Sequence, residues 1–291
     1  MKIGRIWGID IYLNPFFLAL LGLFFVAGIV VKGLIAFGVV LVHEFAHSIV
    51  AKKLKVPVTD VELLPFGGVT RMGADMPVSP RNEIYIAVAG PFANLALFLA
   101  GLALRNYGYW DEVLGPFFLQ CNILIAAFNV LPALPLDGGR VYRAVLAGRI
   151  GIKSATYRAA GLGQAIAVVI VVFGTAGLVL GWSGLDILST GLFLFYAATR
   201  ERKSAPFLFM RQLMLKRDEL SREGVLPVAG LVAREGATLG EVVRMFLPLR
   251  FHYVAIFSDE LEFRGLLPEN RIVEGLFKYG IDHPVGKIDF T

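Results

Sequence analysis

Long apolar stretches separated by short polar segments dominate the first two thirds of the chain. A bilayer core requires about 20 mostly apolar residues per helix. Six stretches meet this requirement, at about residues 13–31, 33–54, 83–104, 115–134, 155–181 and 183–199. The pattern therefore predicts a polytopic α-helical membrane protein with about six transmembrane helices.

The pattern changes after residue 199. Residues 200–221 are basic with interleaved apolar positions, which is typical of an amphipathic helix on a membrane surface and is also compatible with a docking site for a partner. In residues 222–291, short apolar runs alternate with helical patterns, which predicts a small α/β domain. We therefore expect a transmembrane domain at 1–199, a linker at 200–221 and a cytosolic domain at 222–291.

Composition agrees with this division. Hydrophobic residues make up 56% of the 291 residues, which argues against an ordinary soluble enzyme and excludes a disordered chain. The first 199 residues hold 24 charged side chains and the remaining 92 hold 27. The net charge of +5 is spread along the chain without a concentrated basic patch, so we expect no direct nucleic-acid binding. The single cysteine, Cys121, excludes intramolecular disulfides and a thiolate metal cluster.

The distribution of basic residues predicts the orientation in the membrane. With the N-terminus in the cytosol, the predicted outer loops carry only Lys32 and Arg105, and the other basic residues fall on the cytosolic side. Cytosolic loops are enriched in lysine and arginine. Both termini are therefore expected in the cytosol.

The second apolar stretch contains the motif H-E-x-x-H, formed by His43, Glu44 and His47. On a helix the two histidines lie one turn apart on one face, so both imidazoles can reach one Zn²⁺. Glu44 can then act as general base on a zinc-bound water. The alternative is a buried polar cluster that stabilises helix packing, but burying three such groups without a ligand is unfavourable.

A catalytic zinc usually has three protein ligands. His252 and His283 lie in the predicted soluble domain and are poor candidates for the third. Asp137 is the best candidate in the membrane domain, because the prolines and glycines of residues 129–140 let an irregular segment direct a carboxylate toward a polar site. The alternative for Asp137 is a helix cap or a turn residue.

Three further segments have a functional or a structural interpretation. Asn129 could bind a substrate carbonyl, support the metal site or connect helices. The segment Leu63–Val69, broken by proline and two glycines, predicts a short re-entrant loop or hairpin over the site, with a plain surface turn as the alternative. Gly90–Asn94 is interpreted as structural, because glycine permits close helix packing and proline a kink.

Together these motifs resemble the site-2 protease family of intramembrane zinc metalloproteases. The resemblance covers the whole membrane domain and consists, in order, of His43-Glu44-Phe45-Ala46-His47, Pro65-Phe66-Gly67-Gly68, Gly90-Pro91-Phe92-Ala93-Asn94 and Asn129 to Gly139. The variant Pro135-Leu136-Asp137-Gly138, where the family often has Asn-Pro-Asp-Gly, resembles the bacterial branch that includes the sporulation sigma-factor processing protease.

The resemblance implies roles for individual residues. His43, His47 and Asp137 would bind one Zn²⁺ per chain, and Glu44 would activate the water. Asn129 would help to position the substrate, and the segment around Phe66 and Gly67 would lie near its unfolded stretch. The implied location is a bacterial cell (inner) membrane, with the site open toward the cytosol.

The C-terminal region resembles a single CBS domain, the adenosine-nucleotide-sensing module. The similarity rests on Phe257-Ser258-Asp259 and Arg264-Gly265-Leu266-Leu267. It implies ATP or another adenosine nucleotide as a ligand, although Pro268 and Arg271 replace the usual contact residues. A module for dimerisation or substrate docking is the alternative, and a lone CBS-like domain suggests a homo-oligomer.

The leading hypothesis is an intramembrane zinc endopeptidase that cleaves membrane-associated proteins near the cytosolic face of the membrane. Its substrate would be of the kind represented by a transcription-factor precursor or an anti-sigma factor. The alternative is a non-catalytic membrane scaffold or metal transporter with a regulatory CBS-like domain. A transporter often shows internal repeats and a polar path across the membrane, and the sequence has no clear repeat.

Overall fold

The computed structural model describes residues 2–6, 9–56, 58–64, 67–72, 79–108, 110–182, 184–225, 227–247 and 250–289. The chain divides into two compact units, Met1–Tyr142 with Ala159–Thr199, and Arg143–Arg158 with Arg200–Thr291. In chain order the elements are β1 Lys2–Ile6, β2 Ile9–Leu13, α1 Pro15–Val26, α2 Val30–Lys53, β3 Val58–Leu64, β4 Gly67–Met72, α3 Pro80–Asn106, α4 Leu114–Val130, α5 Asp137–Ile150, α6 Ile152–Leu180, α7 Leu185–Glu223, β5 Val228–Arg234, α8 Leu239–Arg244, β6 Phe251–Phe257, β7 Phe263–Pro268, α9 Glu269–Tyr279 and the 3-10 helix Val285–Lys287.

The protein is mostly helical, and three of its described helices are long and apolar enough to cross a membrane. These are α2, α3 and α6. The predicted stretches 13–31 and 115–134 contain the shorter apolar helices α1 and α4, of 12 and 17 residues. The predicted stretch 183–199 forms the beginning of α7, which continues as a helix through residues 200–223.

Polar residues mark the starts of two of these apolar helices. The side chain of Asn14 accepts a hydrogen bond from the backbone N–H of Phe16, and Pro15 occupies the first helical position of α1. Ser79 accepts from the N–H of Asn82 in the same way at the start of α3. Such caps satisfy donors that the first helical turn leaves without partners.

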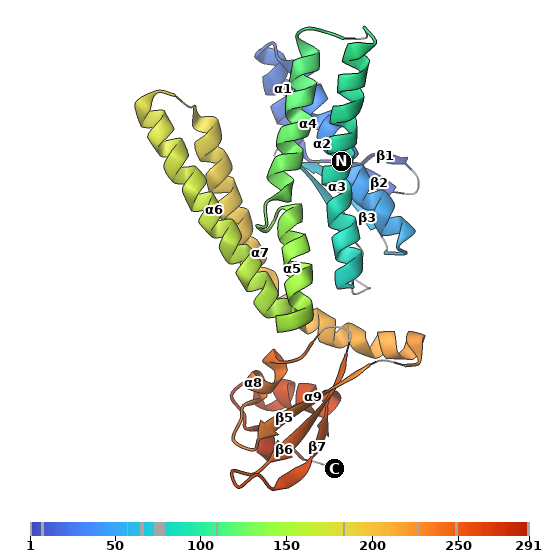
Figure 1. Cartoon of the computed structure of the whole chain (residues 1–291), viewed down its shortest axis with the longest axis vertical. Coiled ribbons are helices and arrows are strands. Elements are labelled where there is room, and N and C mark those ends of the chain that lie inside the picture. The colour runs from blue at the N-terminus through green and yellow to red at the C-terminus, as the bar shows by residue number, and fades with distance from the viewer. Residues whose placement is uncertain are drawn as a thin grey trace. The chain divides into compact units, whose positions relative to one another are not determined.

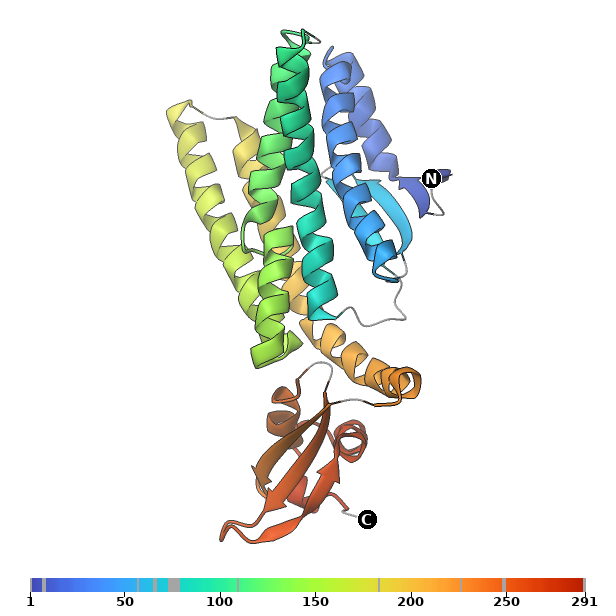
Figure 2. The ribbon, with the colours of Figure 1, turned by 45° about the vertical axis from the view of Figure 1, so that its right-hand side comes forward.

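Helices α2, α3 and α4 lie side by side in the first unit (Figures 1 and 2). A sharp turn joins the end of α4 to the start of α5. It contains a cis peptide bond between Leu134 and Pro135, and the N–H of Leu134 donates to the carbonyl of Ala159 in α6. The turn is therefore attached to a neighbouring helix, which fixes where α5 begins.

Two glycines at the start of α5 allow the turn to close. A Cβ atom on Gly138 would lie 2.5 Å from the carbonyl oxygen of Leu131, and one on Gly139 would lie 2.5 Å from that of Ala133. The obstacles are backbone atoms, which cannot move aside as a flexible side chain could. The turn therefore requires glycine at both positions.

The first unit also contains a four-stranded sheet in the order β1-β2-β3-β4, in which β2 and β3 pair in parallel and the other neighbours pair antiparallel. β3 and β4 form a hairpin in which Leu64 pairs with Gly67, and both strands contact α2. The hairpin predicted for Leu63–Val69 is thus confirmed as a pair of strands, and its position over the site stays a prediction. Phe66 lies outside the described residues.

The second unit contains a small α/β fold, as predicted. β5 and β6 pair in parallel, and β6 and β7 pair antiparallel. Alternating side chains of β6, including Val254 and Ile256, enter a core with α8 and α9. Thr238 and Glu241 form a reciprocal capping box at the start of α8.

Candidate metal centre

His43 and His47 lie one turn apart on α2, and their imidazoles converge as the motif spacing predicts. Their exposed fractions are 4% and 2%. The ring centroids are 4.7 Å apart with an interplanar angle of 85°. The two rings therefore pack edge to face, and both are buried inside the protein.

Asp137 joins the two histidines from a distant part of the chain. Its Oδ2 atom lies 3.1 Å from His43 Nε2 and 3.2 Å from His47 Nε2. Asp137 is the first residue of α5, so the glycine turn described above places its carboxylate at α2. One ligand atom from each of the three residues lies within 4.8 Å of the other two.

These distances fit a metal of the size of zinc. Two ligands bound at about 2.0–2.1 Å in tetrahedral geometry are roughly 3.3 Å apart, close to the observed separations between Asp137 and each imidazole. Two imidazole nitrogens and one carboxylate also form a ligand set typical of catalytic zinc. His43, His47 and Asp137 therefore form a candidate zinc-binding site.

The remaining ring nitrogens are engaged in ways that leave both Nε2 atoms available to a metal. His47 Nδ1 donates to the backbone carbonyl of Ile86 in α3 at 2.7 Å. His43 Nδ1 is hydrogen-bonded to Oδ1 of Asn94, also in α3. Metal-binding histidines commonly use their second nitrogen in this manner, which fixes the tautomer and the ring orientation.

Gly90 allows α3 to approach the two imidazoles. A Cβ atom there would lie 2.6 Å from His43 Cε1 and 2.5 Å from His47 Cε1. The close packing predicted for this glycine is thus confirmed, and its neighbours are the candidate ligands themselves. The site therefore depends on the absence of a side chain on the facing helix.

The second carboxylate oxygen of Asp137 faces a cation. Arg140 Nη1 lies 3.7 Å from Asp137 Oδ1, one helical turn away. The guanidinium charge favours the ionised carboxylate, which is the form that binds a metal. Asp137 is therefore suited to be a metal ligand.

The other predicted site residues occupy different surroundings. Glu44 is half-buried on α2 and interacts electrostatically with its neighbour His43. Asn129 lies near the end of α4, where its amide donates to the carbonyl of Ile125 at 3.0 Å. Gly67 opens β4 at the tip of the hairpin.

Two asparagines that the sequence analysis did not single out individually extend from the site. Asn94, interpreted as part of a structural segment, contacts His43 directly, and Asn122 of α4 contacts Asn94. Both are fully buried. Their signal in the sequence was an amide inside an apolar helix, a placement that calls for a hydrogen-bond partner.

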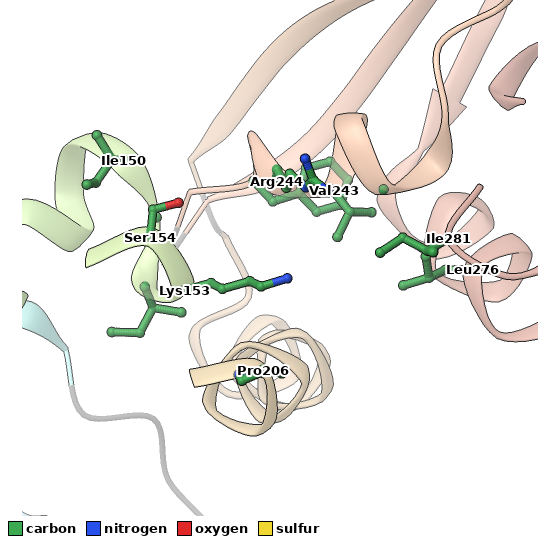
Figure 3. A pocket seen from close by; sticks show the side chains of 12 residues that line it. Ile150, Lys153, Ser154, Pro206, Val243, Arg244, Leu276 and Ile281 are labelled. Atoms are coloured by element: carbon green, nitrogen blue, oxygen red, sulfur yellow. The ribbon is translucent and has the colours of Figure 1, made fainter. Parts of the chain in front are cut away.

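A pocket of about 190 Å³ lies in the second unit (Figure 3). It is lined by the turn between α5 and α6, by Pro206 of α7 and by residues of α8 and the end of α9. Figure 3 shows Lys153 reaching from that turn into the space between Arg244 and Pro206. Its lining includes none of the predicted site residues, and neither Pro268 nor Arg271 belongs to it.

Residues 32–110 match the model of peptidase family M50. The chain is 31% identical over 170 residues to a zinc metalloprotease of Methanocaldococcus jannaschii, covering 56% of this chain and 47% of the relative. It is 28% identical over 133 residues to stage IV sporulation protein FB of Bacillus subtilis, covering 46% of each chain. The chain thus spans about half the length of these curated relatives.

A solved structure is similar in fold. The site-2 protease from M. jannaschii superposes with a TM-score of 0.56 at 29% sequence identity. The similarity covers 69% of this chain and 94% of that one.

Proposed function

We propose that this chain, which matches peptidase family M50 over residues 32–110 and is similar in fold to a solved site-2 protease, is an intramembrane zinc metalloprotease that cleaves membrane-associated proteins. The observation that carries the proposal is the meeting of His43, His47 and Asp137 across more than ninety residues of chain. Here both Nδ1 atoms are bonded elsewhere, and both Nε2 atoms face one carboxylate oxygen.

Each residue of the motif has a defined task in this proposal. His43, His47 and Asp137 hold the metal, and the buried position of all three excludes bulk water from their ligand atoms. Bound zinc would lower the pKa of a water molecule and polarise the scissile carbonyl. Glu44 would take a proton from the attacking water and pass it to the leaving amine, which is general base and general acid catalysis by one carboxylate.

The substrate must present an extended backbone, because the carbonyls of an intact helix are already hydrogen-bonded. The β3–β4 hairpin supports a role in this step, since β4 is the last strand of its sheet among the described residues and an edge strand can pair with an extended peptide. We assign substrate positioning to the hairpin segment around Phe66 and Gly67, together with Asn129.

The topology of the proposal follows the sequence. Six transmembrane helices within residues 1–199 and an excess of cytosolic lysine and arginine put both termini in the cytosol of a bacterial cell. Residues 200–221 form the linker, and residues 222–291 form the regulatory domain. Cleavage then occurs near the cytosolic face, because His43 and His47 lie in the half of α2 that leads to the basic residues Lys52 and Lys53.

The C-terminal domain is the regulatory part of the proposal. Its small α/β fold supports a module that senses a ligand, forms a homo-oligomer or docks the substrate. ATP is the ligand implied by the sequence resemblance. Calorimetric titration of the purified chain with ATP tests this assignment, and an absence of heat at millimolar nucleotide would leave the oligomer and docking roles.

The decisive experiment compares zinc content and proteolysis in the same preparations. Purified full-length protein is reconstituted in lipid vesicles with a panel of tagged single-span membrane proteins. Wild type should hold about one zinc per chain and cleave at least one of them. Glu44→Gln should keep the zinc and lose cleavage, whereas His43→Ala and Asp137→Ala should lose both.

Glu112→Gln is the matched control, because Glu112 is an exposed residue between α3 and α4. It should retain zinc and cleavage. Normal proteolysis by Glu44→Gln would refute the mechanism. A folded wild type that takes up no zinc, or that carries zinc across vesicles without proteolysis, would favour the scaffold or the transporter.

A further inference from the structure

A chain of hydrogen bonds connects His43 to a backbone carbonyl two helices away. His43 Nδ1 is bonded to Oδ1 of Asn94 in α3. Nδ2 of Asn94 donates to Oδ1 of Asn122 in α4 at 3.1 Å. Nδ2 of Asn122 donates to the carbonyl oxygen of Phe118 in its own helix at 2.9 Å.

The donor and the acceptor of every hydrogen bond in this series follow from its last group, the carbonyl of Phe118. A backbone carbonyl can only accept, so Asn122 must present its NH₂ group to Phe118 and its oxygen to Asn94. Asn94 must then present its own NH₂ group to Asn122 and its oxygen to His43. That oxygen also only accepts, so the proton of a neutral His43 imidazole lies on Nδ1 and the lone pair lies on Nε2.

Burial makes this direction hard to reverse. Asn94 and Asn122 both have an exposed fraction of 0%. If either amide turned over, two donors or two acceptors would face each other in a place that water does not reach. A buried polar group without a hydrogen-bond partner lowers the stability of the folded protein by about 1–3 kcal/mol. The Phe118 carbonyl therefore determines, through the two amides, that an acceptor oxygen faces His43 Nδ1.

His47 reaches the same result by a shorter route, since its Nδ1 donates directly to the carbonyl of Ile86. His43 has no such direct bond among those of the described residues and uses the two amides instead. We propose that Asn94 and Asn122 are positioning residues that fix the Nδ1–H tautomer of His43, so that Nε2 is available to the metal. The inference rests on the proposed zinc site and adds to it two residues that do not touch the metal.

The tautomer role predicts a specific interaction between two substitutions. Asn122→Leu removes the group that orients Asn94, whose amide can then turn and favour a His43 with its proton on Nε2. Zinc affinity should fall about 10- to 100-fold, as for other residues that orient a metal ligand. In an N94D background the carboxylate presents an acceptor to His43 in either orientation, and N122L also removes the amide oxygen that would face that carboxylate. N122L should therefore not lower zinc affinity in this background.

The test measures zinc affinity of the purified full-length chain by competition with a fluorescent chelator. Asn106→Leu is the control, because it makes the same change at an exposed position on α3. The proposal is overturned if N122L binds zinc within twofold of N106L. It is also overturned if N122L lowers affinity equally in both backgrounds, since a packing role would do so.

A second measurement does not depend on zinc. The chain has four histidines, so their ring nitrogens can be followed by ¹⁵N NMR in the metal-free protein. The Asp137→Ala background removes the acceptor that lies 3.1 Å from His43 Nε2. In that background His43, assigned by its absence in His43→Ala, should show the Nδ1–H tautomer, and adding N122L should give a mixture. An unchanged tautomer in N122L contradicts the proposal. If wild type binds no zinc, or if His43→Ala still binds it, the metal centre itself is refuted.

Discussion

Gly90→Ala tests whether the candidate metal centre occupies space that a side chain would need. A Cβ atom at position 90 would lie 2.6 Å from His43 Cε1, whereas ordinary van der Waals contact begins at 3.4 Å. The imidazole or the whole of α3 must therefore move by about 0.8 Å. The same Cβ atom would lie 2.5 Å from His47 Cε1.

The size of this movement sets the expected effect. Metal-ligand distances vary by only about 0.2 Å between functional sites, so the displacement is several times what a zinc site tolerates. We expect zinc affinity to fall about 100-fold or more, beyond the 10- to 100-fold typical of residues outside the ligand shell. Overpacking should also destabilise the membrane unit by about 1–3 kcal/mol.

The assay is chelator competition on the folded protein, with helical content verified by circular dichroism. Gly38→Ala on α2 is the matched control, because a Cβ atom there meets nothing within 4 Å. It should bind zinc as wild type does. Equal zinc affinity in Gly90→Ala and Gly38→Ala, both folded, would refute the packing of α3 against the imidazoles.

Three further predictions follow from the same structure. Gly138→Ala places a Cβ atom 2.5 Å from the carbonyl oxygen of Leu131, so the turn should open and zinc content should drop while most helical content remains. Arg140→Leu should weaken zinc binding by up to about tenfold, because Arg140 faces the second oxygen of Asp137; chelator competition would contradict this with an unchanged affinity. Thr238→Ala removes a capping box and should destabilise the second unit by about 1 kcal/mol in denaturant unfolding, with zinc content unaffected; an unaltered midpoint would exclude a contribution from the cap.

Local features of the chain were readable without the structure. The spacing of His43 and His47 depends only on the period of a helix, and apolar length predicted where α2, α3 and α6 would be. The alternation of short apolar runs likewise predicted the α/β fold of the second unit. Asp137 was the candidate third ligand because prolines and glycines surround it, although the same pattern allowed a helix cap.

Most of the four-stranded sheet could not be predicted from the sequence pattern. β2 and β3 pair in parallel although α1 and α2 separate them in the chain. The sequence pattern predicted only the hairpin, because its two strands are neighbours in the chain. Pairing between distant strands depends on where the intervening helices pack, which no local pattern records.

The sequence by itself determined which residues could bind a metal, because ligand chemistry and helical period are local properties. Only the tertiary structure decided that Asp137 meets both imidazoles, that Gly90 leaves room for them and that Asn94 and Asn122 orient His43. These contacts join α2, α3, α4 and α5. The physical reason is that a hydrogen bond or a close approach between helices depends on their relative placement, which the packing of the whole unit sets.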